Sequence, residues 1–598
     1  MRLLVLALLL VVIVHGGLIG DKVNGLFGEG SVGERLRNIT VGGFRKVFGS
    51  AGFLKLGEKL KTLRDKLKAK LALSPERKAA LVEKLKLLKD IKHDHVEAAG
   101  DSIVEVNEKN HMGEMLYQSD IVLTPEQLKA IEEDVTGKRS KRQALRLPQT
   151  LWKDGVVGYS FHGSTTPKAK EVFVKAGELW SRSTCIKFQA VTHGDVIDVK
   201  SEDGCYSNVG KVGGAQNLSL GSGCETVGTA VHEIGHALGL FHTMSRYDRD
   251  QHITINFDNV KTDYMDQFTL QTPATTNNYD VPYEPGSVMH YGASSGSKNH
   301  QVTMVPSDVD YRETLGSAIL SFYDISLINE HYGCKQKCDP KSSAQCKMGG
   351  YPNPNNCQQC VCPGGYGGKL CDERPNDGGE TLQATSEYQK VDKFLGTGRE
   401  ELEFTTLTYW IESPAGTEIE IQIESLAVGL SVDGCVYGGL EIKTQKDQKM
   451  TGYRFCSFSN NGKVLRSNSN RVPVIMYNRH PSNSMAFKYR IAPGSQTTSF
   501  SNNANLVPMD KCVDEVSCGA KKLTGFCKSQ PIEEQKKRCP KACGLCGDAA
   551  PGAAQKITVP AGQCQDQMSC LSLKLTGFCT KQPVEVQIQK CPRTCGHC

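Results

Sequence analysis

The chain has 598 residues and a formal net charge of +6, which indicates several domains rather than one. The basic excess lies within residues 1–142, which hold 25 Lys and Arg against 19 Asp and Glu, whereas the remainder is balanced at 46 of each. All 24 cysteines lie from Cys185 onwards. The cysteine-bearing part therefore has no basic surplus, which excludes nucleic acid as an expected partner.

The N-terminus has the pattern of a secretory signal peptide over residues 1–17. One Arg precedes an apolar run from Leu3 to Val14, and small residues follow. A membrane anchor is the alternative, but the run is shorter than the roughly 20 apolar residues that span a bilayer. No later segment is apolar enough to cross a membrane. We therefore expect a secreted, extracellular protein with no membrane span. The sequons at Asn38 and Asn217 are candidate glycosylation sites, and the even cysteine count predicts disulfides.

Residues 18–142 form a cysteine-free segment. Leucines recur every three or four residues between Leu54 and Leu88, and Ser74-Pro75-Glu76 interrupts the run. Ser suits the helix N-cap and Pro the first helical position, so the pattern predicts two short amphipathic helices. A solvated basic helical pair is favoured over a membrane-binding helix.

The segment ends in a basic cluster, Arg-Ser-Lys-Arg at residues 139–142, which looks like a site for a furin-type processing protease. A charged loop is the alternative. The cluster lies between a cysteine-free basic segment and a cysteine-bearing neutral part. This position favours cleavage after Arg142, and residues 18–142 are then a propeptide.

The stretch VHEIGHALGLFH, from Val231 to His242, contains a metal-binding pattern. His232 and His236 are four residues apart and share one helix face. Gly239 allows the chain to leave the helix and bring in His242 as a third ligand. Three imidazoles suit Zn²⁺ and leave one position for water, and Glu233 has the reach to accept a proton from that water. A core helix with unrelated histidines is the alternative, and five specified residues at fixed offsets argue against it.

The segment PGSVMHYG follows downstream, and with it the chain resembles the astacin family of metzincin zinc proteases. The resemblance covers residues 143–335 and implies an α+β catalytic domain. It implies that Met289 packs beneath the metal. It also implies that Tyr291 is a displaceable fifth ligand that binds the tetrahedral intermediate. The implied disulfides are Cys185–Cys334 and Cys205–Cys224.

Two positions depart from the family pattern. Astacins usually have Glu after the third histidine, where it contacts the buried new N-terminus, and this chain has Thr243. Astacin propeptides carry an F-x-G-D motif whose aspartate binds the zinc, and Tyr117-Gln118-Ser119-Asp120 resembles it with Ser in place of Gly. Asp120 is therefore the candidate fourth ligand in the precursor. The alternative is an aspartate that opens the loop before a helix at Thr124.

Residues 336–372 resemble an EGF-like module, with implied pairs Cys338–Cys357, Cys346–Cys360 and Cys362–Cys371. The stretch RPNDGGETLQ, residues 374–383, is linker-like in composition. Residues 389–492 alternate apolar and polar residues, which predicts a β-sandwich. Residues 373–495 resemble a CUB domain with one cysteine pair, Cys435–Cys456. Gly438 stands where calcium-binding CUB domains have Asp, so no calcium is expected.

Two cysteine repeats end the chain, at residues 512–546 and 564–598, with linkers at 496–511 and 547–563. They resemble ShKT modules. Related toxins block potassium channels through a Lys-Tyr pair, which is replaced here by Ile532-Glu533 and Val584-Glu585. The implied pairs are Cys512–Cys546, Cys518–Cys539, Cys527–Cys543, Cys564–Cys598, Cys570–Cys591 and Cys579–Cys595.

The resemblance implies a secreted zinc metalloendopeptidase, made as a zymogen, with one Zn²⁺ per catalytic domain. The module order looks most like that of nematode secreted astacins. It implies extracellular matrix or cuticle proteins as substrates and a furin-like activating protease. The alternative is an extracellular binding or scaffold protein that acts through its CUB and ShKT modules. The complete set of His232, Glu233, His236, His242 and Tyr291 argues against that alternative.

Overall fold

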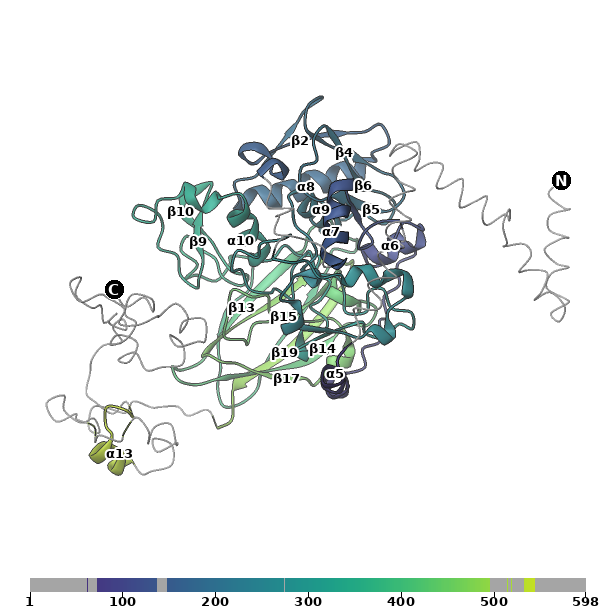
Figure 1. The fold of residues 1–598 in the computed structure, drawn as a ribbon. Coiled ribbons are helices and arrows are strands. Elements are labelled where there is room, and N and C mark those ends of the chain that lie inside the picture. Colours follow the sequence, from purple (N-terminus) through teal and green to yellow (C-terminus); the bar gives the residue numbers. More distant parts are fainter. Residues whose placement is uncertain are drawn as a thin grey trace, which may run out of the picture. The chain divides into compact units, whose positions relative to one another are not determined.

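The computed structural model divides into two compact units, residues 1–497 and 498–598 (Figure 1). It describes Thr62 and residues 73–113, 115–136, 148–273, 275–494, 514, 518 and 532–543. The predicted signal peptide, the sequon at Asn38 and the processing site at Arg142 lie outside the described residues. Among the helices that the structure describes, none has the length and apolar character needed to cross a bilayer.

A six-stranded sheet combines five strands of the predicted catalytic domain with one strand that precedes it, in the order β1-β5-β6-β4-β2-β3. Its strands β6, β4, β2 and β3 are parallel, β5 is antiparallel to β6, and β1 is parallel to β5. The bounds are β1 Ile121–Val122, β2 Val156–Phe161, β3 Lys187–Ala190, β4 Val196–Lys200, β5 Cys205–Asn208 and β6 Ala215–Leu220. Since β1 precedes the predicted cleavage site, the edge strand beside β5 belongs to the predicted propeptide.

Two helices pack against this sheet. Helix α8, Pro167–Ser183, begins where the Thr166 side chain accepts a hydrogen bond from Ala169 N and Pro167 occupies the first turn. Helix α9, Val227–Ala237, begins at the Thr226 N-cap. Caps of this kind satisfy amide donors that the first helical turn leaves free. The sequence therefore fixes where both helices start.

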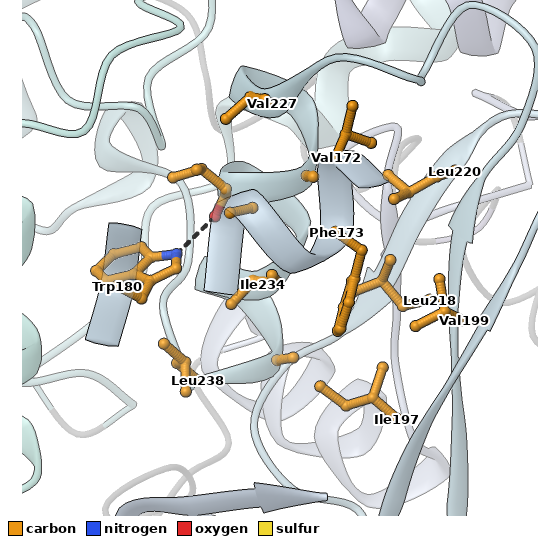
Figure 2. Packing of buried hydrophobic residues seen from close by; sticks show 14 of the residues in the cluster. Val172, Phe173, Trp180, Ile197, Val199, Leu218, Leu220, Val227, Ile234 and Leu238 are labelled. Atoms are coloured by element: carbon orange, nitrogen blue, oxygen red, sulfur yellow. Dashed lines mark hydrogen bonds between the residues drawn. The ribbon is translucent and has the colours of Figure 1, made fainter. Parts of the chain in front are cut away.

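The core between these helices and the sheet is apolar (Figure 2). Phe173 of α8 is 1% exposed, and it packs with Ile197 of β4 and Leu218 of β6, which are fully buried. Trp180 donates from Nε1 to Val231 O at 3.1 Å, which ties α8 to α9. Burial of such side chains stabilises the fold by roughly 1.5–3 kcal/mol each. This packing holds α9, which carries the metal-binding pattern, in a fixed position.

The rest of the predicted catalytic domain is a second lobe with a two-stranded sheet and one α-helix. Strands β7, Ile253–Ile255, and β8, Met304–Pro306, are antiparallel. Helix α10, Phe322–His331, begins with a capping box formed by Ser321 and Asp324. Short 3-10 helices complete unit 1: η1 Pro148–Thr150, η2 Lys153–Gly155, η3 Thr243–Ser245, η4 Arg249–Gln251, η5 Phe257–Asn259, η6 Thr262–Phe268, η7 Val309–Tyr311, η8 Cys334–Lys337, η9 Asp433–Cys435 and η10 Phe458–Asn460.

The predicted propeptide contains three described helices: α5 Pro75–Leu87, α6 Ile103–Lys109 and α7 Pro125–Thr136. The expected helix after Ser74 is present, and the Ser74 side chain caps it by accepting from Arg77 N. Its buried Leu81 belongs to the apolar cluster of the second lobe. The first of the two expected helices lies outside the described residues, apart from Thr62.

Residues 338–371 form a small module with a two-stranded sheet, β9 Tyr351–Asn353 and β10 Asn356–Val361. Its disulfides are Cys338–Cys357, Cys346–Cys360 and Cys362–Cys371, the pairs that the resemblance implies. A module of this size has too little core to be stable alone, so the disulfides contribute much of its stability.

The predicted β-sandwich is present as two sheets around one apolar core. The linker-like stretch RPNDGGETLQ is in fact structured, since it contains strand β11 paired parallel with β13. One sheet has the order β11-β13-β18-β15-β16 and the other β12-β19-β14-β17. The bounds are β11 Thr381–Gln383, β12 Gln389–Leu395, β13 Thr405–Glu412, β14 Ile419–Leu426, β15 Gly438–Ile442, β16 Tyr453–Phe455, β17 Val464–Arg466, β18 Arg471–Asn478 and β19 Asn483–Ile491.

Unit 2 is described only in part. Its described residues include helix α13, Ile532–Arg538, and the disulfide Cys518–Cys539. The other implied cysteine pairs of this unit lie wholly or partly outside the described residues.

Candidate metal centre

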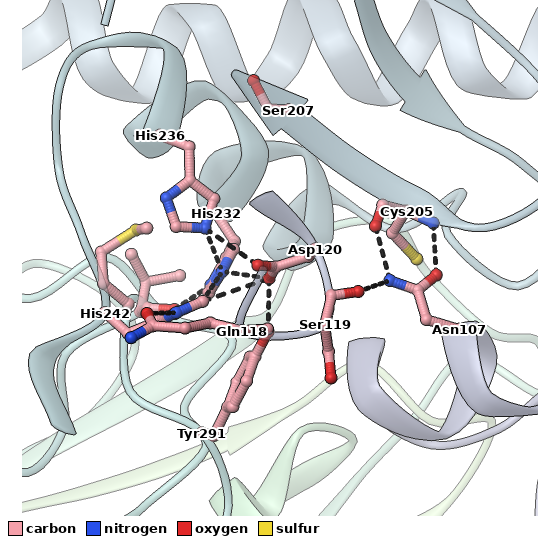
Figure 3. Close-up of polar contacts among 12 residues, drawn as sticks. Asn107, Gln118, Ser119, Asp120, Cys205, Ser207, His232, His236, His242 and Tyr291 are labelled. Carbon is pink, nitrogen blue, oxygen red and sulfur yellow. Dashed lines mark hydrogen bonds and ion pairs between the residues drawn. The ribbon is translucent and has the colours of Figure 1, made fainter. Parts of the chain in front are cut away.

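Helix α9 and the turn after it bring three histidines together in the interior (Figure 3). His232 and His236 lie one helical turn apart and are buried. Gly239 follows the helix with a φ of +108°, a conformation that residues with a Cβ resist. The chain reverses there and places His242 against the other two rings. The structure therefore brings together the three histidines that the sequence pattern selected.

Each ring is held in one orientation by its Nδ1 atom. His232 Nδ1 lies 2.6 Å from Val288 O, and His236 Nδ1 lies 2.7 Å from Leu240 O. His242 Nδ1 lies 2.9 Å from Gln118 Oε1. A carbonyl oxygen only accepts hydrogen bonds, so Nδ1 carries the proton in each ring and Nε2 carries the lone pair.

The three Nε2 atoms converge on one point together with the carboxylate of Asp120. His232 Nε2 lies 3.1 Å from His236 Nε2 and 3.2 Å from His242 Nε2. Asp120 Oδ2 lies 3.1 Å from His232 Nε2 and 3.2 Å from His242 Nε2. A tetrahedral zinc site with ligand bonds of about 2.0–2.1 Å has ligand–ligand edges of roughly 3.3–3.4 Å. Lone pairs this close repel one another unless a cation lies between them, so the donor set fits Zn²⁺.

Burial also sets the protonation of the rings. Burial lowers the pKa of His236, and it takes the pKa of His242 to about 3. Charged imidazolium is disfavoured in the interior, so both rings are neutral at physiological pH. Neutral imidazole is the form that binds a metal.

Glu233 is also buried, and neither of its carboxylate oxygens has a hydrogen-bond partner among the described residues. Burial, and then the nearby Asp120 carboxylate, raise the pKa of Glu233 well above its usual range. An unpaired buried carboxylate is costly, so its retention calls for a role. A carboxylate with a raised pKa is suited to accept a proton from a reacting water.

Met289 lies beneath the metal-binding helix. Its side chain is 1% exposed, and a Cβ added at Gly235 of α9 would lie 2.6 Å from Met289 Sδ. Its turn is anchored by Asp324, which accepts from Ser287 Oγ at 2.6 Å and from Val288 N at 3.0 Å. The turn thus supports the histidines from below. Sequence reasoning did not identify Asp324, because its partner lies 36 residues or more away.

Tyr291 faces the same point as the histidines. Its hydroxyl donates to Asp120 Oδ2 at 2.6 Å and lies 2.8 Å from Gln118 O. Burial raises the pKa of Tyr291 well above its usual value, so the hydroxyl remains a donor. In this structure the Tyr291 hydroxyl is thus engaged by Asp120 and Gln118.

A tight turn in the propeptide presents Asp120. Gln118 and Ser119 have φ values of +50° and +75°, and Tyr117 and Ile121 are hydrogen-bonded across the turn. A positive φ places a residue in the left-handed region of backbone conformation. For a residue with a side chain this raises the free energy of the folded state by roughly 1–2 kcal/mol unless its surroundings compensate. Gln118 N donates to Asp266 Oδ2 at 3.1 Å, and Gln267 Nε2 donates to Ser119 Oγ. These bonds explain how Ser replaces Gly in this motif.

Asn107 of α6 holds this turn against the catalytic sheet. Its amide nitrogen donates to Ser119 O at 2.9 Å and to Cys205 O at 2.6 Å, and its amide oxygen accepts from Cys205 N at 2.7 Å. Sequence reasoning gave no role to Asn107 or to Gln118, whose Oε1 lies beside His242. The only signal was that Gln118 lies two residues before Asp120.

The other predicted sites are distributed over unit 1. The structure contains Cys185–Cys334, Cys205–Cys224 and Cys435–Cys456, the pairs that the resemblance implies. Thr243 is buried and donates from Oγ1 to Ser287 Oγ at 2.8 Å. Asn217 lies half-buried in β6, and its glycosylation stays a prediction.

Comparison with known proteins supports the same assignment. Residues 144–333 match the family model of the astacin peptidases, and residues 511–546 and 563–598 match the model described as "ShK domain-like". The chain is 40% identical to zinc metalloproteinase nas-31 of Caenorhabditis elegans over 84% of this chain and 85% of the relative. It is 34% identical to zinc metalloproteinase nas-32 of the same organism, over 83% and 74%.

Among solved structures, the chain is similar to high choriolytic enzyme 1, a hatching enzyme zinc-protease from the medaka Oryzias latipes. The two are 32% identical over 31% of this chain and 96% of that chain, with a TM-score of 0.30. The sequence identity to the curated relatives extends over most of both chains, and the metal centre has the donor set that the family motif requires. The chain therefore belongs to the astacin family of zinc metalloproteinases.

Proposed function

We propose that this zinc metalloendopeptidase is made as an inactive precursor in which the propeptide residue Asp120 supplies the fourth ligand. The observation that carries the proposal is the position of the Asp120 carboxylate. Asp120 is fully buried, and its two oxygens lie 3.1–3.5 Å from the Nε2 atoms of His232, His236 and His242. A carboxylate at this position excludes both water and substrate.

The active site would form when Asp120 leaves. His232, His236 and His242 would hold the zinc ion, which supplies a Lewis acid that polarises a carbonyl and lowers the pKa of a water molecule. Glu233 would accept the proton of that water and pass it to the leaving amine nitrogen. Tyr291, freed from Asp120, would donate its hydroxyl hydrogen bond to the oxygen that gains charge in the transition state.

The catalytic sheet offers a place for an extended substrate. Strand β5 is bordered by β6 on one side and by the propeptide strand β1 on the other. Loss of β1 would leave unpaired the backbone groups of β5 on the side away from β6. Such an edge binds an extended peptide through main-chain hydrogen bonds. A polypeptide substrate fits this site better than a small molecule does.

The sequence supports secretion and activation outside the cytosol. The seven disulfides in the described residues require an oxidising compartment, and the N-terminal pattern is that of a signal peptide. A furin-like protease would cleave after Arg142. Proteins of the extracellular matrix or cuticle would be the substrates. The three-disulfide module and the sandwich would be EGF-like and CUB domains.

A binding or scaffold protein that acts through its sandwich and ShK-like modules is the alternative. Such a protein would have no need of a buried carboxylate that lies beside three converging imidazoles and has no hydrogen-bond partner among the described residues. Glu233 has these properties. The geometry therefore favours the enzyme.

The test compares three full-length precursors that have not been cleaved: the wild type, Asp120→Ala and Asp120→Ala combined with Glu233→Ala. Hydrolysis of a broad set of quenched peptides is measured, together with zinc content. We expect activity only in Asp120→Ala, below that of the cleaved enzyme because β1 still borders β5, and zinc in all three. A wild-type precursor as active as Asp120→Ala would contradict the inhibitory role of Asp120.

A further inference from the structure

The propeptide contacts a second surface, far from the metal centre in sequence and on a different domain. Residues 93–101 lie against one end of the β-sandwich, where they meet four residues: Gly429, Ser431, Asp433 and Tyr437. These four residues are called the dock below. The segment that meets them precedes Asp120 by 19–27 residues in the chain.

Asp94 makes the central contact with the dock. Its carboxylate accepts hydrogen bonds from Gly429 N at 2.9 Å and from Ser431 N at 2.7 Å. Its own amide donates to Ser431 O at 3.1 Å. Bonds from backbone amides to a carboxylate are charge-assisted and are about twice as strong as neutral ones. The dock therefore recognises an aspartate in an extended segment.

Aromatic and charged contacts flank Asp94 on both sides. The ring of His95 stacks on Tyr437 with centroids 3.9 Å apart, and the Tyr437 hydroxyl donates to Asp101 Oδ1 at 2.8 Å. His93 Nε2 lies 3.1 Å from Asp433 Oδ1. Four side chains of the segment, at positions 93, 94, 95 and 101, thus contact the dock. An incidental contact would involve fewer of them.

Asp433 also connects the dock to the catalytic region. Its Oδ2 accepts from Ser294 N at 2.7 Å and from Ser294 Oγ at 2.6 Å. Ser294 lies three residues after Tyr291 in the chain. The dock is therefore held in place relative to the metal centre by direct hydrogen bonds.

Each of these contacts joins a residue on the N-terminal side of the predicted cleavage site to a residue on its C-terminal side, so none depends on the peptide bond after Arg142. We propose that the dock is a second, metal-independent binding site that retains the propeptide as a separate chain, so that cleavage after Arg142 alone leaves the enzyme inhibited. This inference rests on the proposed zymogen. Two anchors on one ligand raise each other's occupancy, because binding at one keeps the other at high effective concentration.

The test uses full-length precursors cleaved after Arg142 and passed over a size-exclusion column in dilute solution. Asp94→Ala removes the central contact. Asp90→Ala is the matched control, since Asp90 is exposed and lies only four residues away. We expect the wild-type and Asp90→Ala propeptides to co-elute with the enzyme, and the Asp94→Ala propeptide to dissociate at least tenfold faster. Equal dissociation rates for Asp94→Ala and the wild type would overturn the proposal.

A second measurement covers the case in which Asp94→Ala prevents folding of the precursor. A labelled synthetic peptide of residues 88–102 is bound to the wild-type mature chain, freed of its propeptide and stripped of metal with a chelator. This peptide lacks Asp120, so its binding reports on the dock whether or not the zymogen proposal holds. We expect saturable binding that is at least tenfold weaker for the Asp94→Ala peptide and unchanged for the Asp90→Ala peptide. Equal affinity of all three peptides, or no binding by any, would overturn the proposal.

Discussion

Replacement of Asn107 by Ala tests how the propeptide holds its inhibitory turn. The side chain of Asn107 is fully buried and makes three hydrogen bonds, two with the backbone of Cys205 and one with Ser119 O. In the free mature enzyme, water can form hydrogen bonds with Cys205 N and O. The substitution therefore weakens the complex with the propeptide and leaves the free enzyme unchanged. The bond to Ser119 O lies within the propeptide, so the two bonds to Cys205 set the effect on binding. At about 1 kcal/mol each they amount to about 2 kcal/mol, or about thirtyfold weaker inhibition.

The assay titrates propeptide variants against the freed mature enzyme and measures the inhibition constant with a quenched peptide substrate. Asn110→Ala is the matched control, because Asn110 lies at the end of the same helix and its side chain bonds only to Val106 O within the propeptide. We expect Asn110→Ala to inhibit as the wild type does. The reasoning is refuted if Asn107→Ala also inhibits within about threefold of the wild type.

Three further predictions concern the pH dependence of propeptide dissociation, the free energy of unfolding and the retention of zinc. The Asp433 carboxylate raises the pKa of His93, so the bound propeptide favours the charged ring. The contribution of His93 to propeptide binding is therefore complete below the free pKa of about 6.5. It is lost as the pH rises through the raised pKa of the bound state. Propeptide dissociation is therefore faster at pH 8 than at pH 5.5, and His93→Gln reduces this difference. Phe173→Ala lowers the free energy of unfolding by about 3–5 kcal/mol, measured by denaturant titration of the catalytic region. Gly235→Ala forces Met289 to shift and weakens zinc retention during dialysis against a chelator.

Each of these predictions has a result that contradicts it. The His93 prediction is wrong if the dissociation rate of the His93→Gln propeptide changes with pH as much as that of the wild type. Arg312 and Glu105 are the other charged groups that face His93. The core prediction is wrong if Phe173→Ala costs no more than Val174→Ala, which removes an exposed side chain from the same helix. The support prediction is wrong if Gly235→Ala retains zinc as long as the wild type does.

The sequence predicted the metal ligands well because a helix fixes their geometry. Residues four apart on a helix share one face, as His232 and His236 do. Gly239 permits the turn that His242 requires. Strand β14 could be predicted because buried residues alternate with half-buried ones along most of Ile419–Leu426. Both signals are local, so they survive without knowledge of the fold.

The contacts that hold the propeptide could not be predicted in this way. Asn107 bonds to a strand almost 100 residues later, and Asp94 bonds to a loop more than 330 residues later. Neither residue stands in a periodic pattern. The stretch that contains β11 was linker-like in composition, and only its pairing with β13 makes it a strand. Pairing between distant segments is a property of the fold and leaves no signal in a short window.

The most direct test of the central claim compares the mature enzyme, freed of its propeptide, with its Glu233→Ala variant. Both are assayed on quenched peptides and on a folded extracellular matrix protein, and zinc is measured in each. The account predicts one bound zinc in both forms and hydrolysis by the wild type only, abolished by chelation and restored by zinc. Zinc-loaded wild-type enzyme that matches Glu233→Ala on every substrate would contradict the account and favour a binding protein.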